Sequence, residues 1–248
     1  MVISYSSISD TGLVRNNNQD SIFADEKAGC GIFMVADGMG GHSRGELASG
    51  CVAEVLNGWW RRNYALVSKA ESTEIIDMLD TLIEDMNHRI YEMYEQMNLR
   101  GGTTLSILLI NEKNYGIATV GDSRIYQAKG KEVRQISVDD VWENLPENMD
   151  LTEEMVVTDT RYGTLTQALG YDKIVHPRIQ TDAIEADTVF FICSDGVYKY
   201  FSEKQIEKML IRSRRERNLS KSMEKMKREV YKAGAGDNLS GILVKVKL

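Results

Sequence analysis

The chain has 248 residues, of which 42% are hydrophobic and 27% charged, an ordinary composition for a globular protein with a substantial core. No run of about 18 apolar residues occurs and the first ten residues do not resemble a secretory signal, so neither a membrane span nor export is expected. The net charge of −7 argues against a general nucleic-acid binder, and three cysteines and three histidines without metal-ligand spacing indicate a cytoplasmic protein without a disulfide framework or Cys/His zinc site.

The predicted elements alternate between short apolar runs and longer amphipathic stretches. In chain order we expect a strand at 31–36, helices over 43–60 and 71–98, strands at 103–110, 115–120 and 188–193, a helix near 219–230 and a strand at 241–246. The four residues 111–114 suit an antiparallel hairpin. This order favours antiparallel sheets covered by helices, and the lack of linkers or repeats favours one domain over 1–248, with Met and aromatic stripes serving as core.

Aspartate recurs at the ends of the most apolar segments. Asp37, Asp122 and Asp195 each follow a predicted strand, Asp237 stands just before the last strand, and Asp20 precedes the strand-like run 21–24. One such Asp is a turn residue, but several beside Gly suggest that strand ends converge. Converging carboxylates repel unless a cation lies between them, and hard oxygen ligands suit Mg²⁺ or Mn²⁺. The pattern alone leaves a metal cluster and independent turns equally open.

The glycine-rich stretch 37–45 follows a predicted strand and opens a predicted helix. It matches neither the Walker A loop nor the GxGxxG dinucleotide motif. An Asp at its mouth would repel a phosphate unless a cation intervened. A loop that brings backbone close to a metal fits better, with Gly38 needing no side chain.

Two segments carry opposite charge. Residues 139–159 hold eight acidic residues and no Lys or Arg, whereas residues 204–232 hold eleven basic and four acidic ones. The basic run is interpreted as a solvated helix face, with a docking surface for a partner as the alternative. The acidic run is interpreted as a solvated loop, with attraction of basic phosphopeptides or extra cations as the alternative.

Seven motifs occur in order along the chain: RNNNQD at 15–20, VADGMGGH at 35–42, GTT at 102–104, VGDSR at 120–124, LTQALG at 165–170, CSDG at 193–196 and GDN at 236–238. Together they resemble the type-2C metal-dependent Ser/Thr protein phosphatases (PPM family) in their compact bacterial form, over about residues 4–247. The resemblance implies an α+β fold, an α-β-β-α sandwich of two packed antiparallel β-sheets flanked by helices, with the metal site in a cleft at one end. A flap would occupy about residues 139–165.

The resemblance also implies a set of metal ligands. Asp37 would bridge two ions, Gly38 would offer its carbonyl to one of them, and Asp195 and Asp237 would hold the other. Asp122, together with Asp195, would form a weaker third site. The implied cofactor is therefore two Mn²⁺ or Mg²⁺ ions, with a weaker third.

The implied activity is hydrolysis of phosphoserine and phosphothreonine in proteins by a water or hydroxide bridging the two ions, with Arg15, Asp20 and Asp37 as catalytic residues. Arg15 would grip the substrate phosphate and Asp20 would hold metal-bound water. The implied partners are substrates of a cognate Ser/Thr kinase, the enzyme being a monomer that binds neither nucleic acid nor membrane. The alternatives are a phosphatase-like binding module, disfavoured by the intact acid set, and a dedicated partner-switching regulator.

Four positions depart from the family pattern or leave a role open. Gln19 stands where Glu is frequent, Asp140 where His is usual and Gly163 where Asn is common. A neutral amide at position 19 would leave one ion held mostly by water. His42 follows two glycines and is interpreted as a helix cap, with catalysis as the alternative.

Overall fold

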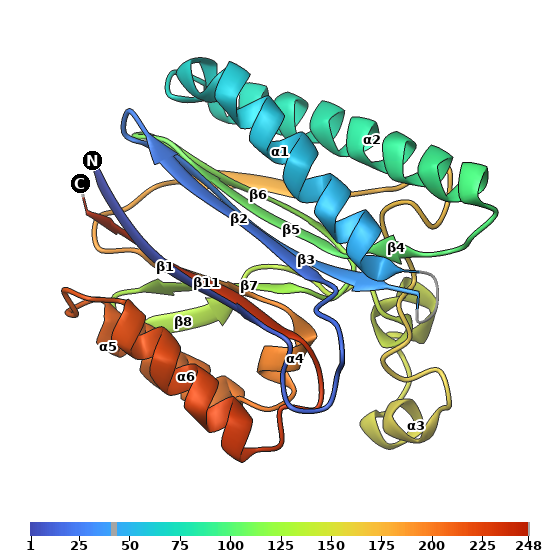
Figure 1. The fold of residues 1–248 in the computed structure, drawn as a ribbon. Coiled ribbons are helices and arrows are strands. Elements are labelled where there is room, and N and C mark those ends of the chain that lie inside the picture. Colours follow the sequence, from blue (N-terminus) through green and yellow to red (C-terminus); the bar gives the residue numbers. More distant parts are fainter. Residues whose placement is uncertain (41–43, 248) are drawn as a thin grey trace.

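The computed structural model describes residues 1–40 and 44–247. Two β-sheets pack face to face, and a pair of helices lies on the outer face of each (Figure 1). The predicted α-β-β-α sandwich is therefore confirmed. Across the described ranges, no helix combines the length and apolar character needed to cross a bilayer. His42 lies outside the described residues.

Each sheet is a run of antiparallel strands. The five-stranded sheet has the order β1 (Val2–Asp10), β11 (Leu239–Lys247), β10 (Val189–Cys193), β7 (Arg124–Lys129) and β8 (Glu132–Gln135). The six-stranded sheet has the order β2 (Asp20–Lys27), β3 (Cys30–Met39), β5 (Leu105–Ile110), β6 (Asn114–Val120) and β9 (Arg178–Ala183), with β4 (Gly102–Thr103) paired to the end of β3. The expected hairpin is confirmed as β5–β6, in which Ile110 faces Tyr115.

Two helix pairs cover these sheets. The helices α1 (Gly45–Val67) and α2 (Ser72–Met97) pack on the six-stranded sheet, and α5 (Glu203–Ser213) and α6 (Ser220–Lys232) on the five-stranded one. Shorter helices occur in connections: α4 (Asp195–Tyr198), α3 (Glu153–Thr158) and the 3-10 turns Trp142–Asn144 and Pro146–Asn148.

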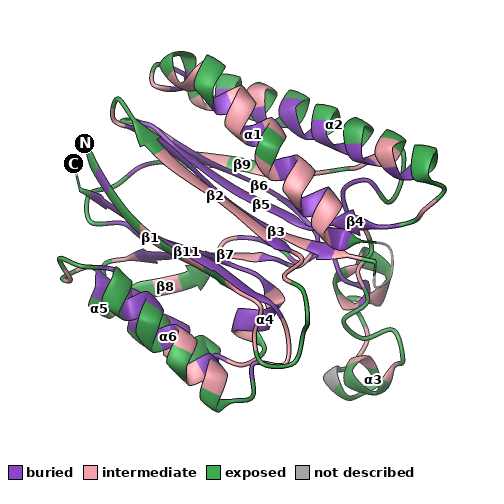
Figure 2. Ribbon diagram, viewed as in Figure 1, coloured by how far each residue is buried: buried purple, intermediate pink, exposed green. Residues whose placement is uncertain are grey.

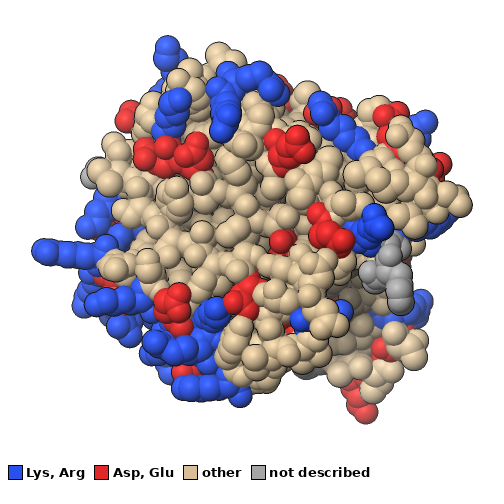
Figure 3. Space-filling view, viewed as in Figure 1, with Lys and Arg blue, Asp and Glu red and all other residues tan. Residues whose placement is uncertain are grey.

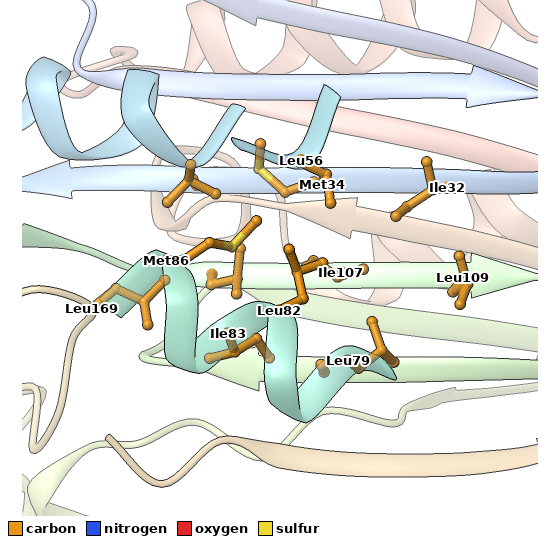
Figure 4. Packing of buried hydrophobic residues seen from close by; sticks show 14 of the residues in the cluster. Ile32, Met34, Leu56, Leu79, Leu82, Ile83, Met86, Ile107, Leu109 and Leu169 are labelled. Atoms are coloured by element: carbon orange, nitrogen blue, oxygen red, sulfur yellow. The ribbon is translucent and has the colours of Figure 1, made fainter. Parts of the chain in front are cut away.

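Apolar side chains form three layers of core, and buried residues line the facing sides of helices and sheets (Figure 2). Under α1 and α2, Leu56, Met86 and Ile107 pack between the helices and the six-stranded sheet (Figure 4). The sheets meet through residues such as Phe33 and Phe190. In α2, Met86 is core as predicted, but Met93 is only partly buried and Met97 is exposed, so the predicted stripe leaves the core at the end of the helix.

The differences from the predicted elements concern polar segments and one helix face. The strands β1, β8 and β9 lie at sheet edges or next to solvent, so few of their residues are buried and the apolar pattern is faint. For the helix at 43–60 the spacing of apolar residues predicts a buried face of Ala48, Cys51, Val55 and Trp59. Ala48 is buried, but beyond it the buried face lies one residue later, at Val52, Leu56 and Trp60.

Candidate metal centre

The register of β2 and β3 places two of the predicted acids side by side. Asp20 begins β2 and pairs directly with Asp37 on β3, and the Gly38 amide donates to the Gln19 carbonyl at 3.1 Å. Asp20 is only 7% exposed. Two carboxyl groups therefore share the buried end of one strand pair, which is unfavourable unless a proton or a cation compensates them.

Two threonines hold the backbone of Asp37. The Asp37 amide donates to Thr104 Oγ1 at 2.9 Å, and the Asp37 carbonyl accepts from the Thr104 amide at 2.8 Å and the Thr103 hydroxyl at 3.0 Å. Thr104 Oγ1 also contacts Ser123 Oγ at 2.7 Å, next to Asp122. The GTT motif, to which the sequence assigned no role, thus positions one acid and links it to the loop of another.

Gly38 is required by packing of the backbone. A Cβ built on it would collide with the carbonyl of Gly45, the first residue of α1, and would lie 2.7 Å from the Gln19 carbonyl oxygen. From the sequence, the missing side chain of Gly38 was interpreted as allowing the backbone to come close to a metal. In the structure, the backbones of Gly45 and Gln19 occupy the space that a side chain would need. The carbonyl of Gly38 remains a candidate ligand.

Burial and like charge raise the pKa of the inner acids. Burial, followed by the charge of Asp195, raises the pKa of Asp20 to about 6 although the Ser194 hydroxyl donates to its Oδ2 at 2.8 Å. Burial and the charges of Asp20, Asp195 and Asp122 raise the pKa of Asp37 well above its usual value. No donor in the described part of the chain reaches Asp20 Oδ1, which is buried. That oxygen and these repelling charges suit a nearby cation or its water.

Two further acids lie within electrostatic reach of Asp37 but have partners of their own. Asp122 accepts from the Tyr198 hydroxyl at 2.9 Å, and burial followed by the charge of Asp195 raises its pKa to about 6. Asp195 begins α4 and faces Lys199 on the next turn, with 2.6 Å between Oδ2 and Nζ. The two residues that the resemblance assigns to a weaker third site are thus close enough to influence each other.

Asp237 is engaged by Arg15. The distance from Arg15 Nη2 to Asp237 Oδ2 is 2.8 Å, and the Arg15 side chain is 54% exposed. Next in sequence, Asn238 accepts from the Gln19 amide at 2.9 Å and donates to the Thr11 and Asn17 carbonyls. Asn238 therefore holds the loop that carries Arg15, a role that the GDN motif did not reveal.

The donor set fits hard divalent cations: every candidate ligand is a carboxylate or backbone oxygen. Within residues 1–40 and 44–247, however, no three Asp, Glu, His or Cys side chains converge as a ready ligand group. The contacts just described give the reason, because Asp195 faces Lys199 and Asp237 faces Arg15. Each of these two acids thus has one carboxylate oxygen, Oδ2, engaged by a side-chain cation.

Gln19 has an acidic neighbour that the sequence interpretation did not anticipate. Its Nε2 donates to Glu46 Oε2 at 3.0 Å, and Glu46 lies in the first turn of α1. Both residues line an open cleft whose walls are Val14, Arg15, Asn16, Asn17, Gln19, Arg44, Glu46 and Gly236. A carboxylate thus lies beside position 19, although the residue there is an amide.

The acidic segment 139–159 is less free than its composition suggests. Asp139 pairs with Arg124 at 2.8 Å, Asp140 with Arg178 at 2.8 Å and Asp159 with Arg161 at 2.9 Å. The partners lie outside the segment, so counting charges within it missed them. Figure 1 shows this segment, with α3, beyond the end of the sandwich.

Asp140 also joins the base of this segment to the Asp122 loop. Its Oδ2 accepts from the Gly121 amide at 3.0 Å and from Gln167 Nε2 at 2.8 Å, and its own amide donates to the Gly121 carbonyl at 2.9 Å. It is 3% exposed. The Asp140 carboxyl is accommodated at this buried position because Arg178, the Gly121 amide and Gln167 all donate to it.

Comparison with known proteins identifies the family. The family model described as protein phosphatase 2C matches residues 14–243. The serine/threonine phosphatase Stp of Listeria monocytogenes is 30% identical over 240 residues, covering 95% of this chain and 92% of that protein.

Solved structures agree over the whole chain. The Mycobacterium tuberculosis phosphatase PstP/Ppp superposes with a TM-score of 0.84 and 26% identity, covering 100% of both chains. The catalytic domain of PstP in complex with two manganese ions gives a TM-score of 0.82 and 27% identity over 99% of each chain. This chain belongs to the protein phosphatase 2C family, the metal-dependent serine/threonine protein phosphatases.

Proposed function

We propose that the chain removes phosphate from phosphoserine and phosphothreonine in other proteins, with the acidic cluster as its catalytic centre. The observation that carries this proposal is the electrostatic coupling of Asp37 to Asp20, Asp122 and Asp195 at one end of the sandwich. Such a concentration of carboxyl groups is costly for folding, so it serves a site that requires cations.

Within this proposal, five residues hold Mn²⁺ or Mg²⁺. Asp37 would contact both ions, Gly38 would contribute its carbonyl to one, Asp195 and Asp237 would hold the other, and Asp122 with Asp195 would hold a weaker third. Two bound ions supply activation of water and neutralisation of phosphate charge. The two manganese ions in the related PstP structure support this cofactor.

Two further residues act on substrate and water. Arg15 lies in the wall of the open cleft and presents a guanidinium that suits phosphate oxygens, which requires that it leave Asp237. Asp20 orients the attacking water through Oδ1, for which the described residues offer no hydrogen-bond donor. Both residues are held by the loop that Asn238 secures, so the phosphate and the water are positioned together.

The cysteines support attack by water rather than by a thiolate. Cys30, Cys51 and Cys193 are free and are buried or half-buried. Burial raises the pKa of the Cys30 thiol to about 11 and that of Cys51 above its usual value. Neutral thiols are poor nucleophiles, so no cysteinyl phosphoenzyme is expected.

The proposal also covers the biological setting. The chain acts as one catalytic domain over 1–248 with a flap at about 139–165, as a cytoplasmic monomer whose substrates are phosphorylated by a cognate bacterial Ser/Thr kinase. Neither nucleic acid nor membrane is a partner, in keeping with the net charge of −7. Gel filtration coupled to light scattering tests the oligomeric state, and a monomer is expected to give the mass of one chain, 28.0 kDa.

The decisive experiment is phosphate release from a phosphothreonine peptide and from p-nitrophenyl phosphate, with Mn²⁺, Mg²⁺ or EDTA. Turnover with either ion and its loss in EDTA are expected. A binding module would bind the phosphopeptide without releasing phosphate, and a dedicated regulator would hydrolyse a single phosphoprotein but not the peptide. Turnover that survives EDTA would contradict the proposed chemistry.

A further inference from the structure

The helices α5 and α6 enclose a groove on the side of the molecule opposite α1 and α2 (Figure 1). The groove is lined by Phe201, Gln205, Lys208, Met209, Arg212, Ser222, Lys225, Met226 and Glu229. Its floor is apolar, because Phe201, Met209 and Met226 belong to the core beneath the helices. Its rim carries the exposed cations Lys208, Arg212 and Lys225.

The rim carries more cations than anions. Arg212 pairs with Glu216 at 2.6 Å, but Lys208 and Lys225 form no ion pair within the described part of the chain. The acidic residue of the groove lining, Glu229, pairs with Lys232, which lowers its pKa together with the charge of Lys225. The run 204–232 has a net charge of +7, and Lys and Arg gather over the lower part of the molecule, where these helices lie (Figure 3). An excess of cations beside an apolar floor suits an anionic partner that carries an apolar side chain.

We propose that this groove docks an acidic segment of the phosphoprotein substrate, with an apolar side chain on the floor and carboxylates at Lys208 and Lys225. The proposal rests on the proposed function, because it concerns the choice of substrate by that active site. It deepens the function from phosphoproteins in general to those with acidic residues outside the phosphorylated position.

A short acidic peptide fits better than other polyanions. The rest of the chain carries −14, so an extended nucleic acid that passed beyond the groove would be repelled. An anionic membrane is usually entered by exposed apolar side chains, and among the described residues no large exposed hydrophobic lies on α5 or α6. A peptide of a few residues meets only the basic surface.

The groove is connected to the catalytic end at both helices. Phe201 follows closely on Tyr198, whose hydroxyl donates to Asp122. At the other side, α6 ends at Lys232 and leads directly into the loop that carries Asp237. A peptide held in the groove therefore lies on two helices that short segments of chain connect to Asp195 and to Asp237.

The test compares two double variants on the same helices. Lys208→Glu with Lys225→Glu reverses the groove rim, and Lys204→Glu with Lys221→Glu makes the same charge change at exposed lysines that do not line the groove. The kcat/KM is measured on a phosphothreonine peptide with a distal acidic segment, on its Gln/Asn-substituted counterpart and on p-nitrophenyl phosphate. Circular dichroism and thermal unfolding confirm that both variants fold, and if either pair does not fold, glutamine replaces glutamate at all four positions.

The groove variant is expected to lose about tenfold in kcat/KM on the acidic peptide, through KM, while the other two substrates change by less than about twofold. The control variant should retain most of the preference for the acidic peptide over its Gln/Asn-substituted counterpart. An equal loss in both double variants, or no loss in the groove variant, would overturn the proposal. So would tighter binding of an RNA oligomer or of phosphatidylserine vesicles than of the acidic peptide at this rim. Absence of turnover on p-nitrophenyl phosphate by the unmodified protein would instead contradict the proposed function.

Discussion

The two halves of the acidic cluster are built differently. The inner half, Asp20 and Asp37, is held by strand register and by Thr104; Asp20 is buried and Asp37 is partly buried. The outer half, Asp195 and Asp237, lies at the start of a short helix and in a loop, and each acid faces a cation of the chain. The inner half is therefore positioned by strand register and by a buried threonine, whereas the outer half depends on partly exposed ion pairs.

This difference separates two tasks. Two neighbouring carboxyl groups in the inner half favour a cation between them, and strand register together with the Thr104 hydrogen bond holds their arrangement. The outer ion pairs are partly exposed, so their exchange costs little, and Arg15 can serve phosphate in one state and Asp237 in another. Variants that disturb the inner half should affect turnover or folding strongly, and those in the outer half should affect substrate binding and smaller increments of stability.

The largest effect is expected at the inner acid. Asp37→Asn should lower kcat by at least about a thousandfold, because it removes the carboxylate that we propose as the ligand shared by both ions. Thermal unfolding in EDTA should show no loss of stability, since the substitution removes a carboxyl whose burial and neighbours disfavour its charged form. Asp80→Asn, at an exposed position of α2, is the control and should match the unmodified protein. A fully active Asp37→Asn variant would remove Asp37 from the mechanism.

In the outer half, Arg15→Met should act on substrate binding. We expect KM for a phosphothreonine peptide to rise by about tenfold to a hundredfold, with a smaller fall in kcat, because the guanidinium is lost while the acids remain. Arg61→Met, on the exposed side of α1, is the matched control. An unchanged KM would show that Arg15 forms the ion pair with Asp237 but does not bind the substrate phosphate.

The scaffold of the inner half can be tested with Thr104→Val, which keeps the shape of the side chain. The substitution leaves the Asp37 amide without its acceptor and should cost about 1–3 kcal/mol of unfolding free energy and about tenfold in kcat. Thr119→Val is the control, because Thr119 is also buried in this sheet but has no side-chain hydrogen bond in the described residues. Equal losses of kcat in both variants would argue against the specific role of Thr104.

The smallest effect is expected at Asp10, whose partners Lys227 and Tyr231 lie on α6, the helix that precedes the Asp237 loop. The effect concerns how the free energy of unfolding depends on pH. Partial burial alone would raise the pKa of Asp10, but hydrogen bonds from Lys227, Tyr231 and the Gly12 amide outweigh it and lower the pKa. A lowered folded-state pKa contributes stability that is present above the unfolded pKa of about 3.8 and disappears as pH falls through the folded value.

The Asp10→Asn variant should therefore be less stable than the unmodified protein at pH 7 by less than about 1 kcal/mol, and the difference should shrink below pH 4. Urea unfolding at pH 7, 5 and 3.5 measures it. Asp25→Asn would be an unsuitable control because that acid accepts from Trp60, so Asp77→Asn, exposed on α2, is used. If the stability difference between Asp10→Asn and the unmodified protein grew as the pH fell, the pKa of Asp10 would be raised on folding rather than lowered.

Much of the architecture could be predicted from pattern. Apolar strands such as β3, β5 and β10 were predicted because they are buried on both faces, and α2 because its buried face repeats every three or four residues. The edge strands β1 and β9 were not, since half-exposed segments carry no such signal. The acids at strand ends were recognised because Asp is unusual there.

What could not be predicted was the partner of each acid. Asp237 meets Arg15 across 222 positions of sequence, and Asp140 meets Arg178 across 38. Neither pairing leaves a local pattern. The acidic segment was therefore interpreted as more solvated than it is, and Thr104 and Asn238 were left without a role.

The sequence by itself determined the family, the order of the elements and the identity of the acids, because these depend on local chemistry and on short motifs. Only the tertiary structure decided which acids are buried, which backbone groups hold them and which face cations. Those properties depend on strand register and on loops from distant parts of the chain, and it is there that the inner and outer halves of the site become different.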